Sequence, residues 1–198
     1  MRETVKVAVR NSIFSAVCTV LGVALNIAGS RFAGVTNIPL YFDSIATIAV
    51  AALCGFIPSL LCAMGTNGIL ALFGPVAWPF MLCHVCTALF ASLIFSYEKK
   101  HKTVQASSFD SFLLAGIASG VSNALLGSSF AYFVMKGNTS VSQIDTGVQG
   151  IFAATHNLAF AVFYCGILFN LVDKALSALF SYCLYRAVRY ATRTSAGK

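Results

Sequence analysis

The residue with the most suggestive chemistry in this sequence of 198 residues is Lys174, which lies within a long apolar run. A lysine in a membrane-spanning segment costs about 2.5 to 3.5 kcal/mol on insertion scales, so it indicates a functional site. Asn170 lies one helical turn earlier on the same face, and together the amide and the ammonium could bind a polar or anionic ligand. Two alternatives remain open, because Lys174 could reach the membrane surface or form an internal ion pair, for instance with Asp173.

Other candidate ligand contacts are polar or aromatic side chains in apolar surroundings. The histidines and asparagines can donate or accept hydrogen bonds, although bonding between helices is their more common role in membrane proteins. The aromatic rings could stack on a flat ligand, although such rings are also common where a membrane meets water. The predicted substrate-binding residues are Asn170, Lys174, His84, Asn123, His156, Tyr41 and Trp78.

Two short motifs would suit catalysis, and each has a simpler explanation. GSSFA at 127–131 fits the GxSxA form around an intramembrane protease serine, with His156 as a later base. Small residues are, however, common in membrane helices. CHVC at 83–86 could be redox-active or bind a metal, but the other cysteines form no second pair of this kind, and small apolar packing accounts for it. We therefore expect no catalytic residue, no metal site and no cofactor.

The composition indicates an all-α integral membrane protein. Hydrophobic residues make up 58% of the sequence and charged residues only 10%, against about 25% charged residues in soluble domains. The length allows about six spans in a single bundle without a separate soluble domain. The net charge of +7 would suggest a nucleic-acid partner in a soluble protein. Here the basic residues gather at the ends of apolar segments, as membrane orientation requires, so we expect membrane lipid and no nucleic acid around the chain.

The stretch from Asn37 to Asn67 predicts a tight helical hairpin. Pro39 and Pro58 stand where helices can begin, and Gly55 allows a short turn between them. The single domain at 1–198 is expected to contain six membrane helices and one helix on the outer side. The six spans are predicted at about 11–29, 40–55, 58–73, 77–97, 109–135 and 170–190, the outer helix at about 151–169, and a polar exposed loop at 136–147.

The distribution of basic residues predicts that both termini are cytoplasmic. Ten of the 13 Lys and Arg residues lie before the first span, after the fourth span or at the C-terminus. An even number of spans follows, so one of the two segments after Gly150 does not cross. We favour the division near Asn170 described above; the reverse choice, with 151–169 crossing and the C-terminal segment on the inner surface, satisfies the charges equally well.

The hairpin sequence PLYFDSIATIAVAALCGFIPSLLCAMGTNGI resembles the second and third helices of S components of energy-coupling factor (ECF) transporters. The matching positions are Pro39, Asp43, Gly55, Gly65 and Asn67. FNLVDKALSALFSYCLY at 169–185 is similar to the start of the last helix in riboflavin-type members, which carries an Asn and a Lys. The resemblance spans most of the chain, with two departures: the first helix lacks a clean run of alanines, and Asp173 is an addition.

This resemblance implies a substrate-binding subunit, not an enzyme, that captures a vitamin or related micronutrient at the cytoplasmic membrane of a prokaryote. A T subunit and two ABC ATPases would supply the energy, which agrees with the lack of a GxxxxGK[ST] motif in this sequence. A stand-alone secondary transporter is the alternative, although the sequence shows no internal repeat. The T subunit would dock on small residues of the first helix, namely Ser12, Ala16, Gly22 and Ala24.

Overall fold

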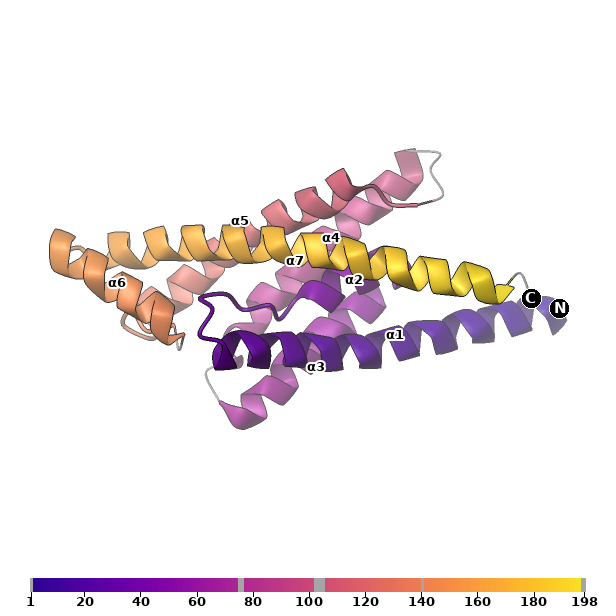
Figure 1. Ribbon diagram of the computed structural model, residues 1–198, viewed down its shortest axis with the longest axis horizontal. Coiled ribbons are helices and arrows are strands. Elements are labelled where there is room, and N and C mark those ends of the chain that lie inside the picture. The colour runs from indigo at the N-terminus through magenta and orange to yellow at the C-terminus, as the bar shows by residue number, and fades with distance from the viewer. Residues whose placement is uncertain (1, 75–76, 102–105, 140, 197–198) are drawn as a thin grey trace.

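Seven α-helices form the part of the chain that the computed structural model describes, which is residues 2–74, 77–101, 106–139 and 141–196 (Figure 1). The described residues contain no strand. The start of α1 and the end of α7 both lie at one end of the bundle, and α6 lies at the other end (Figure 1). The helices are α1 (Arg2–Val35), α2 (Ile45–Cys54), α3 (Phe56–Phe73), α4 (Met81–His101), α5 (Phe109–Phe133), α6 (Ser142–Thr155) and α7 (Leu158–Ala196).

Five of these helices are long and apolar enough to cross a membrane, as expected of a helical membrane protein. Their apolar stretches are Val9–Val35, Phe56–Phe73, Met81–His101, Phe109–Phe133 and Leu158–Thr194. The sixth apolar helix, α2, has only ten residues, or about 15 Å, which is half the thickness of a hydrocarbon core.

The short helix α2 is the centre of the bundle. Every residue from Ala46 to Ala52 is buried, and the helix packs against α1, α3, α4 and α7. Most of its side chains are small, which lets neighbouring helices approach closely. The turn to α3 is a single residue, Gly55, whose φ of 88° and ψ of −164° are essentially restricted to glycine.

The helix predicted at 40–55 is shorter than expected, because residues 36–44 are not helical. Phe42 has a left-handed φ of 48°. The backbone N–H groups of Tyr41 and Phe42 both donate to the same oxygen, Oδ1 of Asp173, each at 2.9 Å. An irregular segment inside an apolar bundle must have its backbone polar groups satisfied by protein, and here a side chain of α7 does so.

The prediction for the last third of the chain is wrong. No helix ends near Asn170; α7 runs unbroken from Leu158 to Ala196, and the side-chain amide of Asn170 donates to the carbonyl of Gly166 in the same helix at 2.9 Å. The break lies earlier, where His156 ends α6 with a left-handed φ of 52°. Asn157 then caps α7 by accepting the N–H of Phe160 at 3.0 Å.

Two further boundaries differ in the same region. The predicted exposed loop at 136–147 becomes helical at Ser142, because Ile144 and Val148 bury one face of α6 against the bundle. The predicted outer helix at 151–169 is therefore divided between α6 and α7. At 39 residues, α7 is about 58 Å long and exceeds a span of about 30 Å, so its basic last turns need not lie in the apolar layer.

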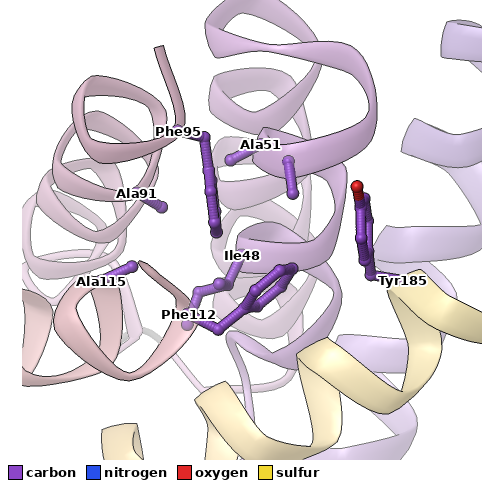
Figure 2. Packing of buried hydrophobic residues seen from close by; sticks show 8 residues of the cluster. Ile48, Ala51, Ala91, Phe95, Phe112, Ala115 and Tyr185 are labelled. Atoms are coloured by element: carbon purple, nitrogen blue, oxygen red, sulfur yellow. The ribbon is translucent and has the colours of Figure 1, made fainter. Parts of the chain in front are cut away.

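The half of the bundle nearer the termini contains an apolar core between α2, α4, α5 and α7 (Figure 2). The rings of Phe95 and Phe112 lie 4.6 Å apart between centroids, and Tyr185 lies 5.2 Å from Phe112. Ile48 of α2 is fully buried beside these rings. A smaller cavity of ≈ 240 Å³ adjoins this core at Ala52 and Tyr185.

The packing between α5 and α7 depends on two glycines of α5. A Cβ atom at Gly116 would lie 2.6 Å from the carbonyl oxygen of Lys174, and one at Gly120 would lie 3.1 Å from that of Asn170. Only the absence of side chains allows the two backbones to approach this closely. These glycines therefore fix the position of the α7 segment that carries Asn170 and Lys174.

Candidate ligand-binding site

A cavity of ≈ 480 Å³ lies in the half of the bundle away from the termini. Its walls come from α1, α3, α4, α5 and α7, with the start of α6 and the connections at that end. It reaches the surface near Val35 and Phe73, which are 82% and 70% exposed. Pockets of this volume enclose drug-sized ligands. The polar side chains that line it are Ser30, Arg31, Tyr41, Asp43, Asn67, His84, Asn123, Ser128, Thr139, Asn170 and Lys174.

Five of the seven predicted site residues line this one cavity, although they come from four separate parts of the sequence. The five are Tyr41, His84, Asn123, Asn170 and Lys174.

The two other predicted residues lie elsewhere. Trp78 is 64% exposed, while its neighbours Ala77 and Phe80 line the cavity. His156 is exposed, because it occupies the left-handed position that ends α6. Its role as the residue that ends α6 accounts for His156 without a contact to a ligand.

Lys174 is held between two carboxylates at the bottom of the cavity. Its Nζ donates to Asp173 Oδ2 at 2.7 Å and to Asp43 Oδ1 at 3.0 Å. It also lies 5.8 Å from the centre of the Tyr41 ring, within the range of a cation–π contact. Of the alternatives that the sequence left open, the structure shows the internal ion pair.

The three groups of this cluster differ in access to the cavity. The side chain of Asp173 is 0% exposed, and its second oxygen accepts the two backbone N–H groups of Tyr41 and Phe42. The side chain of Lys174 is 3% exposed, whereas that of Asp43 is 22% exposed. When all three groups are ionised, one ammonium faces two carboxylates, so the cluster carries a net charge of −1 and presents it through Asp43.

His84 belongs to a chain of hydrogen bonds across four helices. Its Nε2 lies 2.8 Å from Thr47 Oγ1 and its Nδ1 lies 2.7 Å from Asn67 Oδ1. Asn26 Nδ2 donates to Thr47 Oγ1 at 2.9 Å, and Asn67 Nδ2 donates to the carbonyl of Ala77 at 3.2 Å. A neutral His84 with its proton on Nδ1 satisfies the whole chain, so this histidine shapes the wall and has no nitrogen left for a ligand.

The opposite wall, from α5 and α7, offers groups that are less fully bonded. The Oγ of Ser128 is buried without a hydrogen-bond partner among the described residues. The amide of Asn170 donates to its own helix, which leaves its oxygen toward the cavity. Asn123, in contrast, is 3.1 Å from Thr87 Oγ1 and is tied to the neighbouring helix α4. The side-chain oxygen of Asn170 is therefore the acceptor that remains available on this wall.

Comparison with protein-family models, curated proteins and solved structures finds no match to this chain. The geometry of the cavity and the resemblance noted in the sequence therefore carry the functional argument.

The four small residues of α1 predicted to dock on a partner fall into two groups. Ser12, Ala16 and Ala24 are exposed. Gly22 is buried, and a Cβ atom there would lie 2.9 Å from Cys62 Sγ of α3. The prediction is wrong for Gly22, which packs inside the protein, because that side of α1 faces α2 and α3.

The two short motifs lie on α5 and α4, and some residues of each line the cavity. Ser129 of GSSFA donates its hydroxyl to the carbonyl of Leu125 in its own helix at 2.7 Å. No hydrogen bond joins Ser129 to His156 in the described part of the chain. Cys83 of CHVC lines the cavity, and Cys86 is half-buried.

Sequence reasoning missed two features that matter here. Asp43 and Asp173 were noted, but their pairing with Lys174 joins positions up to 131 residues apart, which no local pattern reveals. Asn26, fully buried in α1, was passed over. A polar amide in the middle of an apolar run is a usable signal for such a position, since it must find a partner.

Proposed function

We propose that this chain is the substrate-binding subunit, or S component, of an ECF transporter. It captures a vitamin or related micronutrient from outside the cell. The observation that carries this proposal is the division of the bundle into two halves. One half holds a cavity of ≈ 480 Å³ lined by polar groups, and the other contains the apolar core around Phe95 and Phe112, with a smaller cavity of ≈ 240 Å³ beside Tyr185 and Arg189. A bundle whose larger cavity lies to one side of a packed apolar core suits capture of a ligand better than a continuous pathway.

The basic residues indicate how the protein is oriented in the membrane. Lys99, Lys100, Arg186 and Arg193 are exposed near the end where the termini lie. By the positive-inside rule this end is cytoplasmic, and the cavity faces outward. Six crossings follow when α2 and the non-helical segment 36–44 together count as one. The membrane is the prokaryotic cytoplasmic membrane.

The energy for transport comes from partners, namely a T subunit and two ABC ATPases. The helix best placed to meet the T subunit is α1, which packs mainly against α2 and α3 and is the least buried of the five long apolar helices. Ser12, Ala16 and Ala24 give this exposed side of α1 small side chains that let another helix approach.

The test is purification of the tagged chain from its native membrane in a mild detergent, followed by identification of its protein partners and of any bound small molecule. A T-type membrane subunit, an ATPase pair and a bound micronutrient are the expected result. Vesicles that hold all four subunits should take up the molecule only when ATP is present on the side of the ATPases, and vesicles with this chain alone should not. Uptake by the chain alone would refute the proposal.

A second candidate, a stand-alone ion-coupled carrier, is favoured by one observation. Asp43, Asp173 and Lys174 form a titratable cluster at the cavity, and such residues are common on ion pathways. This candidate predicts uptake by the chain alone, driven by an imposed proton or sodium gradient, in the same vesicles.

A further inference from the structure

Resting on the proposed function, we infer the chemical class of the ligand: a molecule with a flat apolar body and a protonated amine or similar N–H donor, which binds Asp43. An anionic ligand, such as a free carboxylate or phosphate, does not suit this site. The inference reverses the expectation that a lysine alone would suggest.

The first step is that Lys174 has no capacity left for an anion. Two of its three N–H donors are directed to Asp43 and Asp173, and its third side faces the ring of Tyr41. An anion placed beside it would share the ammonium with two carboxylates already in contact with it. Repulsion from both carboxylates would oppose binding in a site of low dielectric constant.

The second step is that the cluster has an unbalanced negative charge, and only Asp43 can present it. Asp173 is 0% exposed and has both oxygens bonded. Asp43 lines the cavity with a side chain that is 22% exposed, and its bond to Lys174 uses Oδ1. Its Oδ2 is therefore available to accept a hydrogen bond from a ligand. A cationic donor there would balance the charge and form a charge-assisted bond.

The third step is independent of the carboxylates. Asn170 lines the same cavity, one helical turn from Lys174, and its side-chain amide donates to the carbonyl of Gly166 in its own helix. Its side-chain oxygen accepts no hydrogen bond among the described residues, so a second N–H or O–H donor of the ligand can bond to it.

The remaining charge on the cavity wall does not alter this conclusion. Arg31 is exposed, and its guanidinium lies 4.8 Å from the centre of the Phe73 ring at the mouth. Phe80 and Val162 add apolar surface to the wall of the same cavity. The site thus combines apolar wall with the anionic cluster at Asp43.

A matched set of three probes tests the class: tryptamine, tryptophol and indole-3-acetate share one ring system and differ in the charge of the side chain. Each is titrated into the full chain in mild detergent by calorimetry, after dialysis to remove bound molecules. Tryptamine should bind at least tenfold more tightly than indole-3-acetate. Asp43→Asn should weaken tryptamine binding by about 10- to 150-fold, the loss expected for one charge-assisted hydrogen bond. The matched control is Asp110→Asn, an exposed carboxylate at the start of α5, which should leave all affinities unchanged.

The outcomes separate the ligand class from the proposed function. Equal or tighter binding of indole-3-acetate, or an unchanged tryptamine affinity in Asp43→Asn, overturns the class while the cavity remains a binding site. Failure of all three probes to bind overturns the class, and the uptake assay in vesicles described above decides the proposed function separately. If Asp43→Asn does not fold, Asn170→Ala serves instead. Loss of its acceptor oxygen should weaken tryptamine several-fold and spare indole-3-acetate, and an unchanged tryptamine affinity would again reject the class.

Discussion

Replacing Lys174 by Met should strongly destabilise the protein, although the change makes an apolar helix more apolar. Lys174 is 2% exposed and is the only cation in contact with Asp43 and Asp173 in the described structure. Removing one partner of a buried ion pair costs about 3 to 5 kcal/mol, because the remaining charge stays buried. For a chain of this size, 1 kcal/mol shifts the melting temperature by about 2 to 4 °C, so a fall of about 6 to 20 °C is expected.

The measurement is the loss of the monodisperse peak after heating in one fixed detergent. Lys100→Met is the matched control, since Lys100 is exposed at the end of α4. A second variant, Asp173→Asn with Lys174→Met, should recover at least half of the loss. The introduced amide would keep an oxygen for the N–H groups of Tyr41 and Phe42, and the change would remove the most deeply buried charge.

Two results would refute this reasoning. A melting temperature for Lys174→Met within about 2 °C of the unchanged protein would mean that the ion cluster is not buried as described. A double variant whose loss equals the sum of the two single losses would mean that the two groups are not coupled, because residues in direct contact should deviate from additivity.

Three further predictions follow from orientation and packing. A single cysteine at Thr36, in a cysteine-free chain, should react with an impermeant reagent added outside intact cells, and protection there would reverse the proposed orientation. Gly22→Trp should prevent folding, since even a Cβ there meets a side chain of α3. Ala16→Trp should leave the isolated chain folded and able to bind its ligand, but should abolish co-purification of the T subunit. Gly116→Ala should lower the free energy of unfolding by about 1 to 3 kcal/mol, because the added Cβ meets the α7 backbone. Gly150→Ala, where nothing lies within 4 Å of the added Cβ, should raise it by about 0.5 to 1 kcal/mol. Equal effects of the two changes on the melting temperature would contradict the close approach of α5 and α7.

The middle of the fold could be predicted from the sequence because its signals are local. The apolar runs of α3, α4 and α5 are bounded by proline, glycine or charged residues, which end helices or cannot enter an apolar layer. The predicted helix at 58–73 differs from Phe56–Phe73 by only two residues. The turn at Gly55 follows from the same local chemistry.

The C-terminal third could not be predicted by length alone. A stretch of about 60 Å was divided at Asn170 because one span needs only about half of it, yet a helix can continue beyond the membrane without cost when its last turns are basic. The better signal was Asn157, since asparagine is among the preferred residues at helix N-caps.

The candidate site was partly predictable for a physical reason. Polar residues in apolar runs must find polar partners, so most of them converge on one cavity. Which partner each finds depends on the fold. The bonds from Asp173 to the backbone of Tyr41 and Phe42 span more than 130 positions, and the sequence offered a neighbouring Asp and Lys without showing that Asp43 would complete the cluster.

The length of α7 gives the protein a mechanical property. The helix is in close contact with α5 near Lys174 and continues to its basic end around Arg193, about 28 Å further along the axis. A rigid rod that tilts by about 5° at that contact moves its far end by about 2.5 Å over this distance. Small adjustments of α7 around a bound ligand would therefore be magnified into a displacement at the opposite end of the molecule, without any rearrangement of the packed core between them.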